Sequence, residues 1–453
     1  MINKALLALY AYEAMDFVYG EEHRHCCDGW EKNKVGFKWF NRRHTRGEKL
    51  LDAMATIISL QSGRRPVSLI RAPESTHLEL VIASAQLMTP AQVSNFERYL
   101  TLLTKTASVT DALIDASQAE VVVHAYRICR DEVDKIVIAR AAHLAPTLPQ
   151  IAEAIKAYSA KEGEDVSYEI HILELARSAI KSLLAYRAAA TAAATADSAG
   201  EALVLQLHRD LIAIIPALYM KAEVTIMDSA VEGYISGALV EVCFLSRALD
   251  DMIQAVASDK DLRAHLRSGA LRCDWIKPRT KPDAVSIILD EPSMEGLRSC
   301  LPALKDTSVE QFVQAIDDKL KAGDRYPTNR GIARNPRNLP ATFEVQESIH
   351  CEAALIAYLD DQAIDSTVYI ASALPACYAC HLLAISMREV QGCNSFRLGP
   401  YDGVIDCGWE FPALRHVAEL EKIMLTKSDA HLRVVVDAYH RAKEPWTQDA
   451  SGW

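Results

Sequence analysis

Apolar residues recur at helical spacing through most of the first two thirds of the chain. Between residues 47 and 60, Leu50, Leu51, Met54 and Ile57 fall at intervals that place them on one face of a helix. The same pattern predicts further helices, which span residues 2–19, 91–104, 119–142, 148–159, 167–189, 202–228 and 230–257. No repeat of fixed length links these segments, so the pattern predicts a large all-α region rather than a solenoid.

Helical periodicity fades after Arg263 and returns only at residues 308–321. The intervening sequence is basic and contains several prolines, and a second basic stretch runs from Lys319 to Arg337. Such a change in composition is typical of a join between domains. We therefore expect a helical N-terminal region over residues 1–295 and a second domain over residues 296–453.

Beyond Leu339 the pattern alternates between strands and helices. Strands are predicted at residues 342–345, 367–371 and 404–407, and helices at residues 350–359, 377–390, 413–425 and 430–442. This alternation is typical of a layered α/β domain. The whole chain is thus predicted to be an α+β multidomain protein, with a large all-α N-terminal region followed by a C-terminal α/β domain.

The composition and charge of the chain bear on whether it is a nucleic-acid-binding, secreted or membrane protein. The 453 residues are 50% hydrophobic and carry a formal net charge of -11, which argues against a general binder of phosphate backbones but leaves room for a local basic groove. Neither a secretory signal nor an apolar run long enough to span a membrane is visible, and the eleven cysteines follow no regular framework. We expect an intracellular protein, cytoplasmic or nuclear, with reduced thiols and no membrane partner.

Two short fragments of the second domain carry candidate chemistry. Cys377 and Cys380 are three residues apart, so on a helix their thiolates share one face, and the first turn of that helix favours the thiolate form. His350 opens the preceding predicted helix and would supply a third zinc ligand, which leaves one coordination position open, as in catalytic zinc sites. Glu352 would then move protons between bound water and substrate without being a ligand.

On these fragments, residues 340–412 resemble the cytidine deaminase-like superfamily, and specifically a divergent fungal-type branch with a long helical N-terminal region. The resemblance implies a three-layer α/β domain, a Zn²⁺ cofactor held by His350, Cys377 and Cys380, and Glu352 as the general acid/base. The implied reaction is hydrolytic loss of an exocyclic amine from cytosine or adenine, in a nucleoside, nucleotide or nucleic acid.

The sequence departs from the family pattern in two ways. Ala376 separates Pro375 from Cys377, whereas the family places proline directly before the first cysteine. The family's sheet also opens with a hairpin, of which only the second strand, residues 342–345, is evident. We expect the missing strand near residues 331–333 or within residues 284–289.

Substrate contacts are predicted at three further positions. Ser372 ends the strand that leads to the cysteines, and Tyr401 and Trp409 follow the second metal helix, where an aromatic ring can stack on a base. The expected partner is a nucleobase-containing substrate, either a small molecule or a single-stranded nucleic acid.

Simpler interpretations remain open. Cys377 and Cys380 can be core thiols with His350 a buried, hydrogen-bonded imidazole, and a redox C-x-x-C pair would leave His350 and Glu352 unexplained. The rival function is a catalytically inactive, zinc-stabilised interaction scaffold whose helical region binds partners. A helical toxin or effector is a third possibility.

Overall fold

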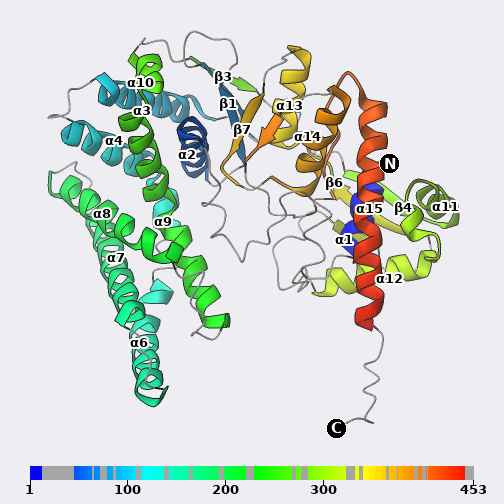
Figure 1. Ribbon diagram of the computed structural model, residues 1–453, viewed down its shortest axis with the longest axis horizontal. Coiled ribbons are helices and arrows are strands. Elements are labelled where there is room, and N and C mark those ends of the chain that lie inside the picture. The colour runs from blue at the N-terminus through cyan, green and yellow to red at the C-terminus, as the bar shows by residue number, and fades with distance from the viewer. Residues whose placement is uncertain are drawn as a thin grey trace. The chain divides into compact units, whose positions relative to one another are not determined.

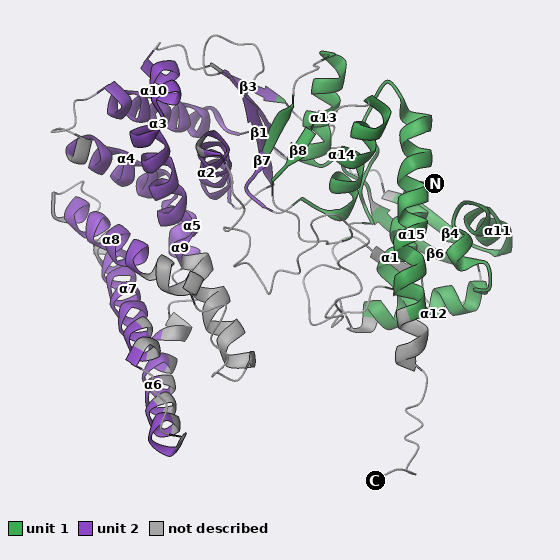
Figure 2. Cartoon of the chain, in the orientation of Figure 1, with its two compact units in different colours: residues 1–32, 276–370, 375–453 green, residues 33–275, 371–374 purple. Residues whose placement is uncertain are grey.

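The computed structural model divides into two compact units (Figure 2). Unit 1 comprises Met1–Lys32, Ile276–Ile370 and Pro375–Trp453, and unit 2 comprises Asn33–Trp275 and Ala371–Leu374. Within them the structure describes residues 1–12, 45–63, 66–71, 79–84, 88–108, 114–136, 142–162, 167–192, 198–220, 229–267, 272–276, 284–322, 332–335, 340–363, 367–374, 376–391, 396–399, 405 and 407–443. These residues are mostly helical with a smaller amount of sheet, so the fold is α+β in general terms.

Unit 2 is built largely of helices, as the apolar pattern predicts (Figure 1). They are α2 (Arg46–Gln61), α3 (Pro90–Ser108), α4 (Ile114–Ile128), α5 (Arg130–Ile136), α6 (Ala142–Glu162), α7 (Ser167–Ala192), α8 (Ser198–Met220), α9 (Ser229–Ser258) and α10 (Lys260–Arg267). Helix α2 packs against α9, and α7 packs against α8. Thr45 begins α2 with a capping box, in which its side chain accepts from the Glu48 N–H and the Glu48 carboxylate accepts from the Thr45 N–H.

Strands also occur in the region that was expected to be all-α, so that expectation is wrong in this respect. β1 (Val67–Arg71) and β2 (Glu79–Ser84) pair antiparallel, and β3 (Arg272–Ile276) follows α10. The first four residues of β1 and the last five of β2 are buried without alternation. A short continuous apolar run has no period that distinguishes a buried strand from a buried helix, which is why the pattern did not reveal these strands.

Unit 1 contains a three-stranded antiparallel sheet in the order β4-β6-β5. Its strands are β4 (Ala284–Leu289), β5 (Ile332–Asn335) and β6 (Ala341–Gln346), and Val345 of β6 lies opposite both Val285 and Ile332. β6 is the strand predicted at residues 342–345. Both segments considered for a missing partner strand are strands, and each pairs with one edge of β6.

The N-terminal helix α1 (Ile2–Tyr12) belongs to unit 1 and is buried on nearly all sides. It packs against α12 (Val309–Ala322) and α15 (Val417–Lys443), which lie far along the chain from it. The remaining short helices of this part are α11 (Glu291–Cys300) and η6 (Pro302–Leu304). Residues 13–19, the second part of the helix predicted from residue 2, lie outside the described residues.

The predicted alternation after residue 350 is confirmed through α14. The elements are α13 (Cys351–Asp361), β7 (Val368–Ser372), α14 (Tyr378–Gln391) and β8 (Phe396–Leu398), with β8 parallel to β7. The last two residues of β7, Ala371 and Ser372, pair with Leu69 and Ser68 of β1 in unit 2. The α13–β7–α14–β8 order places the starts of α13 and α14, which carry the candidate ligands, in unit 1.

Two predictions for the C-terminal part are wrong. Ile405 and Cys407, the described members of the strand predicted at residues 404–407, belong to no strand, and the strand after α14 is the three-residue β8 instead. The two closing helices predicted at residues 413–425 and 430–442 form one continuous helix, α15. Among the described residues, no helix has the length and apolar character needed to cross a membrane.

Candidate metal centre

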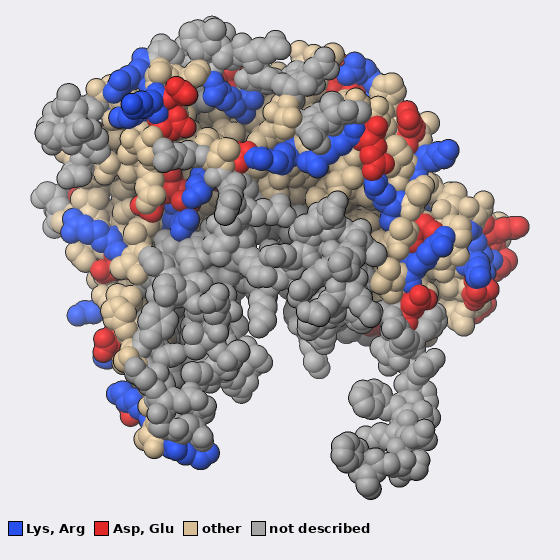
Figure 3. Space-filling view, viewed as in Figure 1, with Lys and Arg blue, Asp and Glu red and all other residues tan. Residues whose placement is uncertain are grey.

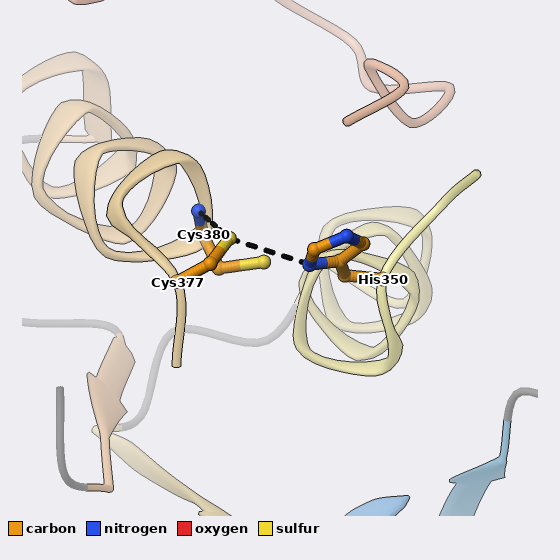
Figure 4. Close-up of side chains that lie close together, drawn as sticks. All are labelled: His350, Cys377 and Cys380. Carbon is orange, nitrogen blue, oxygen red and sulfur yellow. Dashed lines mark hydrogen bonds between the residues drawn. The ribbon is translucent and has the colours of Figure 1, made fainter. Parts of the chain in front are cut away.

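His350 is the residue at which α13 begins. Its backbone is extended (φ -73°, ψ 155°), and its side chain makes no capping hydrogen bond to the helix. A serine or aspartate at such a position would normally fold back onto the first turn. The imidazole instead extends toward the start of α14, as Figure 4 shows.

The two cysteines lie at the start of α14. Cys377 directly precedes the helix, and Cys380 is its third residue. The backbone N–H of Cys380 donates to the Sγ of Cys377 at 3.5 Å, so the first sulfur occupies the position of an N-terminal cap. The helix dipole is positive at this end and favours negative charge on both sulfurs.

The three predicted ligands converge, which confirms that this group could hold a metal ion. Their ligand atoms all lie within 4.8 Å of one another, and His350 Nδ1 is 3.3 Å from Cys377 Sγ (Figure 4). Nitrogen and sulfur atoms bound to one tetrahedral zinc ion lie roughly 3.5–3.8 Å apart, so this donor set fits such an ion with little movement. Imidazole and thiolate are also the ligands that zinc sites prefer.

The two thiols differ in their acidity. Burial raises the pKa of Cys377, but hydrogen bonding with Cys380 and the charge and hydrogen bond of His350 outweigh burial and lower it from 9.0 to about 6. Burial, the hydrogen bond and charge of Cys377, and the charge of Glu352 all raise the pKa of Cys380 well above 9.0. Cys377 is therefore the more acidic of the two thiols, and a metal ion bound by both sulfurs would have to displace the proton of Cys380.

Glu352 lies beside the cluster without being one of the three grouped ligands. It is in the first turn of α13, and only 7% of its surface is exposed. Its Oε2 accepts a hydrogen bond from the thiol of Cys380, with 3.7 Å between the heavy atoms. A carboxylate so close to a metal-binding sulfur can reach a water molecule in the same site.

The three predicted substrate residues have different surroundings. Trp409 is fully buried, and its Nε1–H donates to Cys380 Sγ at 3.4 Å, so it touches the site from within the protein core. Ser372 is buried in unit 2, where its hydroxyl lies 2.9 Å from that of Ser68. Tyr401 lies outside the described residues, as does Pro375. Cys351, between His350 and Glu352, is buried.

Sequence reasoning missed an ion pair with a buried carboxylate at the far end of the helix that begins the site. Asp360, in the last turn of α13, is 2% exposed and accepts hydrogen bonds from the backbone and guanidinium of Arg415. No sequence motif marks this pair, because the two residues are 55 positions apart.

The chain was compared with protein-family models, with curated proteins and with solved structures, and none of these matches it. The site consists of one imidazole nitrogen, two sulfurs and an adjacent buried carboxylate. Such a set can bind a soft divalent ion and transfer protons next to it.

Proposed function

We propose that this protein is a zinc-dependent hydrolytic deaminase that acts on a nucleobase, cytosine or adenine. The observation that carries the proposal is the convergence of His350, Cys377 and Cys380 beside the buried carboxylate of Glu352. A structural zinc site usually has four protein ligands, whereas a catalytic site has three and leaves a position for water. In the proposed fold, α13, β7, α14 and β8 form the core of a three-layer domain of the cytidine deaminase type.

Each side chain has a defined task in this proposal. A zinc ion in the site would lower the pKa of a coordinated water from 15.7 toward about 7. His350, Cys377 and Cys380 hold the ion, and His350 presents its Nδ1 to the site. Glu352 accepts a proton from the attacking water and returns it to the departing amine, so that ammonia leaves as a neutral molecule.

A nucleobase is the proposed substrate because the chemistry replaces an exocyclic amine by oxygen. Lys and Arg side chains are interspersed with Asp and Glu side chains across the face of the described residues drawn in Figure 3. That distribution and the net charge of -11 favour a free nucleoside or nucleotide over a long nucleic acid. Binding that weakens steeply with added salt would instead indicate a nucleic acid.

Metal content and ammonia release test the proposal together. Purified protein should contain about one zinc ion per chain and release ammonia from a cytosine- or adenine-containing compound. Glu352→Gln keeps the size of the side chain but removes the base, so it should retain zinc and the fold while activity falls by at least ~100-fold. Glu344→Gln on β6 is the matched control, since this exposed glutamate lies on another element and should leave activity unchanged.

The outcomes separate an enzyme from a scaffold. Loss of ammonia release in Glu352→Gln with zinc retained supports catalysis. Zinc binding without ammonia release from any nucleobase compound would favour the interaction scaffold. Metal-free protein with an intact fold would end the proposal.

A further inference from the structure

We propose that Trp409 is a positioning residue of the metal site, whose indole N–H holds the sulfur of Cys380 in place as a ligand. This inference rests on the proposed zinc site, because it gives Trp409 a task only if Cys380 binds a metal. It replaces the expectation that Trp409 stacks on a substrate base with a role inside the core.

The indole has a fixed position and one polar group to satisfy. Trp409 is 0% exposed, and its Nε1–H donates to Cys380 Sγ at 3.4 Å. The ring of Phe411 meets the indole edge-on, with centroids 5.5 Å apart and planes at 77°. A fully buried indole N–H without an acceptor is costly, so the sulfur and the indole stabilise each other's positions.

The chain on either side of Trp409 is held to the rest of the site. The residues directly before and after Trp409 both bond to Ser348. The Ser348 N–H donates to Gly408 O at 2.7 Å, and the Glu410 N–H donates to Ser348 O at 3.0 Å. Ser348 is two residues before His350, so this isolated parallel bridge joins the indole to the start of α13. Asn3 of α1 also donates to the side chain of Glu347, the residue before Ser348. This bond attaches the segment that leads into α13 to α1 as well.

A second attachment lies beyond Phe411. Arg415 donates from its backbone N–H, Nε and Nη2 to the carboxylate of Asp360, at 2.9, 3.1 and 3.0 Å. Asp360 is in the last turn of α13, where the helix dipole disfavours a carboxylate, and this carboxylate is nearly fully buried. Arg415 supplies the compensating donors. The segment 409–415 is therefore attached near the start of α13 through Ser348 and at its end through Asp360, while the indole contacts Cys380 of α14.

Glu352 and Trp409 contact the Cys380 sulfur in different ways. The Cys380 thiol donates to Glu352, whereas the indole nitrogen can only donate and needs no proton from sulfur. The indole bond is compatible with a thiolate and becomes charge-assisted. Trp409 can therefore hold the Cys380 sulfur as a ligand, because its N–H donates to the sulfur in either form.

The test compares Trp409→Phe with wild type in two measurements that do not depend on turnover. Zinc affinity, measured by competition with a chelator, should fall about 10-fold or more, as is typical when a partner of a metal ligand is removed. The thiolate-to-cobalt charge-transfer band of the Co²⁺-loaded protein should also shift. Trp275→Phe on β3 in unit 2 is the matched control and should leave both measurements unchanged.

A second variant guards against a fold defect in Trp409→Phe. Arg415→Lys keeps the indole and the positive charge but loses the geometry of the guanidinium bonds to Asp360, and zinc affinity should fall by roughly 2–5-fold. Unchanged zinc affinity and an unchanged cobalt spectrum in both variants would overturn the inference.

The results also separate this inference from the proposed function. If the wild-type protein binds zinc and Trp409→Phe weakens that binding, but no ammonia is released, the deaminase is refuted and the role of Trp409 is supported. Ammonia release with full zinc affinity in Trp409→Phe would do the reverse. Wild-type protein that binds no zinc would remove both.

Discussion

Buried cysteines occur in both units, yet the surroundings of Cys377 in unit 1 give it a different acidity from the buried cysteines of unit 2. In unit 2, Cys129 and Cys243 each donate only to a backbone carbonyl, that of Ile57 at 3.7 Å and that of Leu211 at 3.8 Å. Burial raises the pKa of Cys243 from 9.0 to about 12, and that of Cys129 still further. These thiols are core residues that keep their protons.

In unit 1 the same residue type is equally buried, but its neighbours are different. Cys377 is 8% exposed and has the imidazole of His350 and the N–H of Cys380 against its sulfur. Those contacts reverse the effect of burial and bring the pKa of Cys377 to about 6. A buried thiol is thus inert by default, and donors that converge on it at a helix start favour its thiolate form.

The largest effect expected from this comparison is loss of metal binding. The double substitution Cys377→Ser with Cys380→Ser removes two of three ligands, so zinc content should fall from about one ion per chain to background. Cys243→Ala in unit 2 should retain full zinc content and reduce the free energy of unfolding by only about 1 kcal/mol. Equal zinc loss in both proteins, measured by mass spectrometry of the metal, would remove the distinction between the two kinds of thiol.

Thiol reactivity should separate the same residues in metal-free protein. At pH 7 a thiol with a pKa of about 6 is mostly ionised, whereas one with a pKa of about 12 is almost entirely protonated. Cys377 should therefore react with iodoacetamide at least ~100-fold faster than Cys243, and its rate should fall as pH drops through about 6. Peptide mass spectrometry gives both rates. Added zinc should protect Cys377, and a rate for Cys377 no faster than that of Cys243 would contradict the assigned acidity.

A third prediction extends the comparison from sulfur to imidazole. Burial and the charge of Arg209 lower the pKa of His208 in unit 2 from 6.5 to about 4. Between these values the unfolded chain binds a proton that the folded chain does not, so stability is lost as pH falls from 6.5 to 4. The loss amounts to at most about 3 kcal/mol.

Urea unfolding of wild type and His208→Gln at pH 4.5–7 measures this linkage. The variant should show a shallower fall in the free energy of unfolding over that range and the same dependence as wild type above pH 7. Parallel curves at all pH values would show that His208 is not buried in its neutral form.

The smallest expected effect concerns a neutral pair in the core of unit 2. The hydroxyls of Tyr126 and Ser246 lie 2.7 Å apart, and both are buried. Tyr126→Phe leaves one hydroxyl without its partner and should lower the free energy of unfolding by ~1–2 kcal/mol, while zinc content stays unchanged. A change in zinc content would mean that the two units are coupled.

The ligand set could be predicted because it is local. Cys377 and Cys380 share one helical turn, so their spacing alone places both sulfurs on one face, and His350 and Glu352 lie two residues apart at the start of another helix. The convergence of the two helix starts followed from the resemblance. Most helices of unit 2 were likewise predicted from apolar periodicity.

What could not be predicted depends on contacts between distant residues. Ser68 and Ser372 are 304 positions apart, and the sequence of β1 contains no pattern that predicts a partner at such a distance along the chain. The last helix is predicted as two helices, with a gap at residues 426–429. The helix continues because Asp429 accepts from Ala303 N–H and pairs with Arg433, and Ser428 is buried. Trp409 was interpreted as a base-stacking residue, since an aromatic residue in a sequence does not show which side of it faces the core.

The packing of α1 against α15 has a consequence for synthesis of the chain. The ribosome synthesises Ile2–Tyr12 about 400 residues before Val417, where α15, one of the helices packed against it, begins. At roughly 5–20 residues per second, this delay lasts ~20–80 s. Unit 2 can fold within that interval, since nearly all of it lies between. An apolar helix without its neighbours for so long is a binding target for chaperones, and α15 must be synthesised before unit 1 can form.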